Sequence, residues 1–494
     1  MTETVTARGA PASVPRFDSA FCDPASRRWI LIAAILGSSM GFIDGSVVAI
    51  AIPAIRAGLG ASLAEAQWIN NAYMVAISAL VLAGGSVGDR FGTARIFTLG
   101  ILVFLAASIA CAAAPSADAL IWARWVQGGG AALMVPGSLA IIARAYPREV
   151  RGRAIGYWAG ASAMTTALGP VIGGLVMSFG PDGMWRSVFA VNLPLGLVAL
   201  WLVRRHVRRD RTRPDRGLDI PGAVLATLGL GLLAWGCIRI ETGPGARWLL
   251  AGGAAALVLF LLAEWRAPRP IMPLDLFRDR AFRVSNLATF ALYFGLSAIV
   301  FFLPMLLISG WGLNEIEAVL ALGPIAVTIA LLSRPFGKLG DRLGPVTMIC
   351  AGSLVVALGY WWLSHAVTTQ TFWGGIIVPM CVIALGMAMV VAPLSTAIMA
   401  GAGEDAGGVA SGVNNAVSRV AGLFAVAAMG PVVASAYRRA GGTLSYGEVR
   451  ESSEIHVAAM TEAFSAVATI CAVFAAIAAA IALLAIIRPP RRRA

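Results

Sequence analysis

The stretch Gly85-Ser86-Val87-Gly88-Asp89-Arg90-Phe91-Gly92 decides the fold, because it returns later as Gly337-Lys338-Leu339-Gly340-Asp341-Arg342-Leu343-Gly344. Both copies read G-x-x-G-D-R-x-G, and every matched position lies 252 residues from its counterpart. Each copy follows an apolar run long enough to cross a bilayer as a helix. A charged, glycine-rich turn at the same place in two halves indicates an internal repeat, which constrains the whole architecture.

The composition is that of a membrane protein. Of the 494 residues, 59% are hydrophobic and 13% are charged, with a mean hydropathy of +0.81. Soluble domains carry about 25% charged residues. The apolar residues form runs of roughly 20, the length of a membrane-crossing helix. We therefore expect an all-α polytopic membrane protein.

Fourteen such runs are present, and this even number places both termini on one side of the membrane. They cover roughly residues 29–55, 67–88, 95–115, 118–143, 154–179, 185–203, 217–239, 246–265, 284–308, 316–336, 346–365, 371–397, 408–436 and 463–487. Of the 38 Lys and Arg residues, 29 fall in segments on the side of the termini and seven in segments on the other side. Because cytoplasmic segments carry this excess, we expect a multi-pass cell (inner) membrane protein with both termini cytoplasmic.

The residues that mark other classes of protein are missing or misplaced. Arginines beside anionic headgroups account for the net charge of +13 without a nucleic-acid partner. The six cysteines form no C-x-x-C pair, so no metal site is predicted, and no Walker-A sequence indicates ATP as the energy source. Two G-x-S-x-G matches, at 37–41 and 84–88, lie in or at the end of predicted membrane helices, where no nucleophile elbow forms. We expect neither enzyme activity nor a cofactor.

The position of the second repeat copy divides the chain. It follows the tenth predicted span, whereas two plain six-span bundles would place it after the eighth, so two spans are inserted between the halves. The predicted parts are a cytoplasmic tail (1–28), a six-helix bundle (29–203), basic loops with a two-helix insert (204–283), a second six-helix bundle (284–487) and a basic cytoplasmic tail (488–494). A lipid-facing spacer and a functional element both remain open as roles for the insert.

Several motifs together resemble those of the major facilitator superfamily and, within it, the fourteen-span drug:proton antiporters. The Asp89-Arg90 turn resembles the superfamily signature between spans 2 and 3. Further matches are Ile43-Asp44-Gly45-Ser46-Val47-Val48 in span 1, Arg124-Trp125-Val126-Gln127-Gly128 in span 4, Gly169-Pro170-Val171-Ile172-Gly173-Gly174 in span 5 and Asn192-Leu193-Pro194-Leu195-Gly196 in span 6. The chain departs from the family pattern at Ser46, which replaces a threonine, and at Ala49, which replaces an asparagine. The resemblance implies a major facilitator fold and export in exchange for protons.

Asp44 is the only acidic residue near the middle of a predicted span, where a charged carboxylate costs about 2.5–3.5 kcal/mol. A carboxyl group there can take up a proton on one side of the membrane and release it on the other. Its alternative role is a structural hydrogen bond to a neighbouring helix. The second buried charge is Arg124, and helix rise places Asp44 ~16 Å and Arg124 ~9 Å from the outer ends of their spans. Long side chains can cover that difference, so we predict that the two meet and couple transport to protons.

The repeated turn is predicted to gate the cytoplasmic side. Its glycines permit a tight turn, and Asp89 can pair with a nearby arginine when that side is closed, which biases an alternation between two states. A simple topogenic turn is the alternative. The predicted gate residues are Gly85, Asp89, Arg90, Gly92, Asp341 and Arg342.

Span 5 carries the motif that the family associates with export. Pro170 removes a helix hydrogen bond, and Gly169, Gly173 and Gly174 allow close packing against a neighbouring helix. A pliable, closely packed helix suits a rocking motion, although a packing kink would need the same residues.

Polar and aromatic groups on the predicted inner helices are candidates for the substrate cavity, each with interhelical hydrogen bonding as its alternative role. They are Gln67, Asn70, Asn71, Tyr73, Gln127, Trp158, Asn286, Asn414, Asn415 and Arg419. Arg419 is the strongest single candidate, because a cation within a span needs a partner. That partner is an asparagine, a backbone carbonyl or an anionic group of the substrate.

These features predict a proton-coupled secondary transporter that exports lipophilic drugs or other small toxic compounds by alternating access, as in multidrug efflux and antibiotic resistance. Two alternatives stay open: an exporter dedicated to one endogenous metabolite, antibiotic or lipid, and a non-transporting membrane receptor or scaffold. The expected partners are a small lipophilic substrate, protons and the lipid bilayer. The sequence does not say whether a periplasmic protein takes part.

Overall fold

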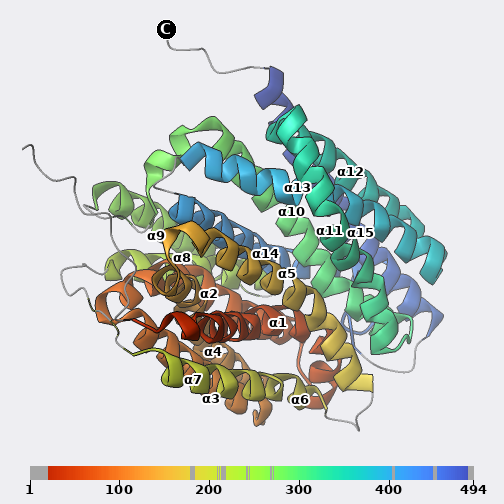
Figure 1. The fold of residues 1–494 in the computed structure, drawn as a ribbon. Coiled ribbons are helices and arrows are strands. Elements are labelled where there is room, and N and C mark those ends of the chain that lie inside the picture. The colour runs from red at the N-terminus through yellow and green to blue at the C-terminus, as the bar shows by residue number, and fades with distance from the viewer. Residues whose placement is uncertain are drawn as a thin grey trace, which may run out of the picture.

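The structure is a computed structural model that consists of packed helices. It describes residues 21–178, 184–208, 210, 212, 219–240, 243, 245–267, 270, 272–402, 407–448 and 453–487. The helices form two groups, one coloured red to yellow and the other green to blue (Figure 1). The first group contains α1 (Arg27–Leu59), α2 (Leu63–Phe91), α3 (Thr93–Ala112), α4 (Ala117–Ala145), α5 (Arg148–Ser178), α6 (Trp185–Ala190) and α7 (Asn192–His206).

The second group begins after the insert. It contains α10 (Arg280–Met305) with its π-helical extension η3 (Leu306–Gly310), α11 (Glu315–Leu343), α12 (Pro345–Ala366), π-helical η5 (Phe372–Ile377), α13 (Val378–Ala402), α14 (Gly407–Arg439) and α15 (Glu454–Ile487). Between the groups run α8 (Ile220–Ile238) and α9 (Ala246–Arg266), which pack on each other. Because α8 also packs against α2 and α14, the insert lies along the junction of the two groups.

Most of these helices are long and apolar enough to cross a membrane. Among the described residues, twelve pass by length and composition, or thirteen if the bent pair Leu63–Val81 and Ala83–Phe91 forms one span. Helix α5 covers another predicted span, but its apolar part, Leu168–Ser178, is short. Length and composition therefore support twelve or thirteen spans of the fourteen predicted, in a multi-pass membrane protein.

The sequence repeat is also a structural repeat. Gly92 ends α2 and begins α3 with φ +104°, and Gly344 ends α11 and begins α12 with φ +89°. L-residues with a side chain rarely adopt such angles, which explains why glycine stands at both turns. The same offset relates the two helix starts, where Ser62 with Glu65 and Asn314 with Glu317 form reciprocal capping boxes. Each box satisfies backbone groups that the first turn of a helix leaves free.

Contacts near the ends of the helices define two sides of the molecule. The start of α1 contacts the end of α7 through Trp29 and His206, and the start of α10 contacts the end of α15 through Arg280 and the Leu484 carbonyl. The end of α1 meets the loop after α14, as described next. The described chain therefore starts and finishes on one side, called the terminal side here, and we call the other the opposite side.

The two groups are fastened together on the opposite side. Arg56, at the end of α1, is buried and donates hydrogen bonds to the Tyr446 carbonyl and, at 3.2 Å, to Ser445 Oγ in the loop between α14 and α15. The Tyr446 hydroxyl donates to the Phe302 carbonyl of α10 at 3.1 Å, which anchors the loop. A Cβ added to Gly174 of α5 would lie 2.8 Å from Val319 of α11, so these helices also touch across the junction.

The terminal-side half of the same junction is more open. Cβ atoms built on Gly156 and Gly160, toward the terminal side of α5, would have no described atom within 4 Å. Contact at one end of α5 and open space at the other indicate a conformation that is closed on the opposite side.

Replacing Arg56 with alanine should loosen this closure. Hydrogen bonds from a charged donor contribute about 1.5–3 kcal/mol each, so we expect the population open on the opposite side to rise about tenfold or more. Double electron–electron resonance between spin labels on the exposed positions Ala57 and Ile455, in a background without native cysteines, measures that population. Arg439→Ala is the control, because Arg439 is exposed and bonds to Ser435 of its own helix. Unchanged distances in Arg56→Ala protein would contradict the closure.

Candidate functional site

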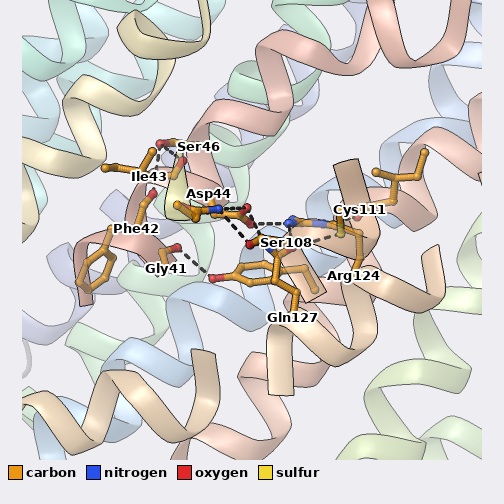
Figure 2. Close-up of polar contacts among 12 residues, drawn as sticks. Gly41, Phe42, Ile43, Asp44, Ser46, Ser108, Cys111, Arg124 and Gln127 are labelled. Atoms are coloured by element: carbon orange, nitrogen blue, oxygen red, sulfur yellow. Dashed lines mark hydrogen bonds and ion pairs between the residues drawn. The ribbon is translucent and has the colours of Figure 1, made fainter. Parts of the chain in front are cut away.

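The buried charge pair lies between two helices of the first group. Asp44 on α1 and Arg124 on α4 are both 0% exposed, and Arg124 Nη1 donates to Asp44 Oδ2 in an ion pair. Figure 2 shows the two side chains pointing toward each other, with Ser108 and Gln127 beside them. The structure therefore brings together the two groups that the sequence indicated would meet.

Two amides complete the surroundings of the carboxylate. Gln127 Nε2 donates to Asp44 Oδ1 at 2.9 Å, and Asn192 Nδ2 lies 3.3 Å from the same oxygen. Both amides also donate to Ser108 Oγ, at 2.9 and 3.3 Å. An ionised carboxylate is an acceptor only, so a guanidinium and two amide donors around Asp44 suit its charged form.

Arg124 is held from several directions. It donates from Nε to the Ile69 carbonyl at 3.1 Å and from Nη1 to Gln127 Oε1 at 2.6 Å. Its guanidinium carbon lies 4.4 Å from the ring centroid of Tyr73, whose hydroxyl donates to the Gly41 carbonyl at 2.9 Å. Arg124 belongs to α4 and contacts Asp44 of α1 and two residues of α2, so its charged and aromatic contacts hold these three helices together.

Two members of this cluster, Ser108 and Asn192, were not among the predicted site residues. Asn192 does belong to the span-6 motif quoted above, and it is the first residue of α7, directly after the break that separates α7 from α6. Ser108 lies in the apolar second half of α3 (residues 100–112) and belongs to none of the motifs quoted above. Gln127, predicted as a substrate contact, lies fully buried within the Asp44 cluster.

The first copy of the gate sequence packs against Asp210, a residue that the sequence did not single out. Arg144 donates to Asp210 Oδ1 at 3.0 Å, and the Arg95 backbone N–H donates to Asp210 Oδ2 at 2.9 Å. A Cβ on Gly92 would lie 2.6 Å from that carboxylate, so glycine lets Asp210 approach. Arg90 lies over the Phe91 ring at 5.4 Å.

The second copy is related but not identical in its surroundings. A Cβ on Gly340 would lie 2.9 Å from Pro393 of α13, as close packing of α11 on α13 requires. Asp341 and Arg342 are exposed, whereas Gly85, Asp89 and Arg90 are half-buried. The two turns therefore share a backbone conformation and differ in what covers them.

The glycines of the predicted antiporter motif face α1 and α11. A Cβ on Gly169 would overlap Ser46 Oγ and lie 3.1 Å from the Ile43 carbonyl, and one on Gly173 would lie 2.7 Å from Val47. Gly174 faces Val319 of α11, and Pro170 lies inside α5. The motif therefore sets how closely α5 approaches α1 beside Asp44, and it reaches the other group of helices.

Most of the other predicted cavity residues of the first group make hydrogen bonds between or within helices. Gln67 donates to the Val426 carbonyl of α14, and Trp158 Nε1 donates to Ser38 Oγ of α1 at 2.8 Å. Asn70 donates to Asn71 Oδ1 at 3.3 Å. In the described structure, the buried Asn71 Nδ2 has no hydrogen-bond partner, so this amide remains available to a ligand or a water molecule.

The predicted residues of the second group form two separate contacts. Asn414 on α14 donates to Thr289 Oγ1 at 2.7 Å and to Asn286 Oδ1 at 3.3 Å, both on α10. One residue further along, Asn415 Oδ1 accepts a 3.3 Å hydrogen bond from Arg419 Nε. The Arg419 guanidinium carbon lies 6.0 Å from the ring centroid of Phe42, so Arg419 extends from α14 toward α1.

An apolar cavity of about 240 Å³ lies beside the insert, and none of the predicted cavity residues lines it. Ser78 of α2, Leu230 of α8, Leu257 of α9, Phe290 of α10 and Val417 of α14 are among its lining residues. The insert thus helps to enclose space at the junction of the two groups. Within the described part of the chain, no group of three or more His, Cys, Asp and Glu residues is placed to hold a metal ion.

The ion pair predicts an asymmetric effect on stability. Removing one partner of a buried pair costs about 3–5 kcal/mol, and Asp44→Asn should reach that range because an arginine cannot shed its charge. Arg124→Gln should cost less, because Asp44 can take up a proton. In the double variant, much of the loss should be recovered. Thermal unfolding in detergent measures all three, and an Asp44→Asn protein as stable as the wild type would contradict the pairing.

The α5 glycines give a second prediction with an internal control. Gly169→Ala should force α5 away from α1 and destabilise the protein by about 1–3 kcal/mol, as overpacking typically does. Gly160→Ala on the same helix adds its methyl group to open space and should be nearly neutral. The same unfolding measurement compares them, and equal effects would mean that α5 is not held close to α1 at Gly169.

Comparison with known proteins identifies the family. The model of the Major Facilitator Superfamily matches residues 34–426. The methylenomycin A resistance protein of Bacillus subtilis (strain 168) is 32% identical over 425 residues, which cover 82% of this chain and 87% of that protein. The tetracenomycin C resistance and export protein of Streptomyces glaucescens is 31% identical over 420 residues, covering 83% of this chain and 76% of that one.

Solved structures agree at the level of the fold. A bacterial homolog of the human lysosomal transporter Spinster matches with a TM-score of 0.69 at 18% identity, covering 93% of this chain and 97% of that chain. A D-xylose-proton symporter matches with a TM-score of 0.61 at 16% identity, covering 91% and 97%. Because the family model matches most of this chain, the protein belongs to the major facilitator superfamily, a family of transporters rather than enzymes.

Proposed function

We propose that this protein is a proton-coupled exporter of small lipophilic compounds, antibiotics among them. The observation that carries the proposal is the fully buried Asp44–Arg124 pair beside the α5 glycines. The pair contains one carboxylate, Asp44, which accepts hydrogen bonds from side chains of α4 and α7. Asp44 lies on α1, which packs against α5. Relatives that confer methylenomycin A resistance or export tetracenomycin C support the cargo class.

In the proposed cycle, Asp44 alternates between pairing with Arg124 and binding a proton. In the conformation closed on the opposite side, Arg124, Gln127 and Asn192 favour the ionised carboxylate. A rearrangement that separates Arg124 from Asp44 would leave the buried carboxyl group without a neighbouring cation, and burial favours its neutral form. Proton uptake and release would then follow the alternation of the transporter between its two states.

The proposed topology has fourteen spans. Thirteen helices pass by length and composition when the bent pair in α2 counts as one span, and α5 would be the fourteenth. Its packing against α1 and α11 supports this assignment. The parts are then the bundles 29–203 and 284–487, with 204–283 as the insert and 1–28 and 488–494 as tails. The excess of Lys and Arg supports cytoplasmic termini in the inner membrane, which makes the terminal side cytoplasmic.

In this topology the repeated turns with Asp89 and Asp341 belong to a cytoplasmic gate. Gly169, Pro170, Gly173 and Gly174 serve the rocking of the bundles, because they keep α5 against both α1 and α11. The substrate would bind among the remaining polar groups between the bundles, including Asn71, Trp158 and Asn415. An exporter dedicated to a single compound would use the same machinery, and several unrelated dyes leaving cells would argue against it.

Transport in inverted vesicles with an imposed pH gradient tests the proposal. Methylenomycin A or tetracenomycin C should dissipate the gradient in vesicles with the wild-type protein, and Asp44→Asn should reduce that proton flux at least about a hundredfold, to background. The Asp44→Asn/Arg124→Gln double variant is the control, since restored stability should not restore proton flux.

Three results would count against the proposal in different ways. Full proton-driven export by Asp44→Asn would remove Asp44 from the coupling. Export without any proton flux would leave a transporter with another energy source. A protein that moves no compound and tolerates both neutral substitutions would be a receptor or scaffold.

A further inference from the structure

Arg419 on α14 differs from Arg124, the buried arginine of the first bundle, in how its positive charge is balanced. Arg124 is 0% exposed and pairs with Asp44. Among the described residues, no carboxylate lies within ion-pair distance of Arg419, and its hydrogen bond is the 3.3 Å contact from Nε to the neutral Asn415. Its contact with the Phe42 ring, at 6.0 Å, is longer than that of Arg124 with Tyr73, at 4.4 Å. Within the described part of the chain, the positive charge of Arg419 is therefore not balanced by a carboxylate at ion-pair distance.

The free donors of this pair converge. Arg419 is only partly buried, and its Nε–H is directed to Asn415, so the two terminal nitrogens remain for another acceptor. Asn415 accepts through Oδ1, which leaves its amide N–H₂ to donate. The two residues stand one helical turn apart on the same face of α14. A guanidinium fork beside an amide donor matches a planar anion such as a carboxylate.

Aromatic rings lie next to these donors. Phe42, which Arg419 approaches, meets Trp158 edge-on with ring centroids 6.3 Å apart. Trp158 is fixed by its hydrogen bond to Ser38. The rings belong to α1 and α5, whereas the donors belong to α14, so a compound bound here would touch both bundles.

We infer that Arg419 and Asn415 recognise the anionic group of an amphipathic organic anion, whose apolar or aromatic body packs against Phe42 and Trp158. This inference rests on the proposed export function and names its substrate class. An unpaired guanidinium within the membrane is costly. An anionic cargo that pairs with Arg419 removes this cost, which favours its binding. An inside-negative membrane potential then favours export of the anion as well as entry of the proton.

Three probes with one aromatic body separate charge from lipophilicity: pyrenebutyrate, its primary amide and pyrenebutylammonium. Each is titrated at neutral pH into the full-length protein in lipid nanodiscs, with pyrene fluorescence as the signal. Wild-type protein should bind the carboxylate about tenfold or more tightly than the amide, the size of one charge-assisted pair. Arg419→Gln should abolish that preference while amide affinity stays within about twofold.

Matched variants separate recognition from folding. Arg419→Lys should keep part of the preference, because it retains the charge without the fork. Arg439→Gln, at the exposed end of the same helix, should leave all affinities unchanged. Equal wild-type affinity for the carboxylate and the amide, tighter binding of the ammonium probe, or an equal loss for all three probes in Arg419→Gln would overturn the inference and leave the export proposal standing. Failure of the wild type to bind any probe would also overturn the inference, whereas the export proposal is tested separately by the vesicle assay.

Discussion

The Asp44–Arg124 ion pair is the contact on which the rest of the first bundle depends. A carboxylate in the middle of a span is costly alone, and a guanidinium that cannot lose its proton is costly too. Together they require amide donors from α4 and α7, a backbone carbonyl from α2 and a ring from α2. Four helices are thus arranged around a group whose charge is expected to change, which links the state of one proton to the packing of the bundle.

The two halves of the molecule share local backbone features but differ in their charged groups. Both have a capping box at the start of the second helix of the repeat and a left-handed glycine at its end, at matched positions. The first half contains a neutralised charge pair, while the second contains Arg419 with a neutral neighbour. In the proposed exchange of a proton for cargo, the first half would bind the proton and the second half would bind the charged group of the cargo.

Much of this architecture could be predicted from the sequence, because long apolar runs and a repeated turn are local signals. All fourteen predicted segments correspond to helices, and helix rise was enough to anticipate that Asp44 and Arg124 meet. The break between α6 and α7 at Val191 and the position of Ser108 depend on packing between distant helices, so no local pattern indicated them. The capping boxes at Ser62 and Asn314 do have a local signal, because S-x-x-E and N-x-x-E stand at matching positions of the two halves.

The position of the insert, α8 and α9, could not be predicted from the sequence. The composition of residues 217–265 left a spacer and a functional role equally open, whereas the structure lays α8 against α2 and α14 and encloses an apolar cavity there. Such a position follows from the shapes of three surfaces that are far apart in the chain. It cannot be derived from the hydropathy of any one of them.

Infrared difference spectroscopy of the purified protein in lipid, between alkaline and acid pH, tests the central claim most directly. If Asp44 takes up and releases the transported proton, acidification of the wild type should produce the C=O stretching band of a protonated carboxyl group that Asp44→Asn protein lacks. Identical carboxyl bands in the two proteins would mean that Asp44 keeps one protonation state throughout, and that this carboxylate does not carry the proton.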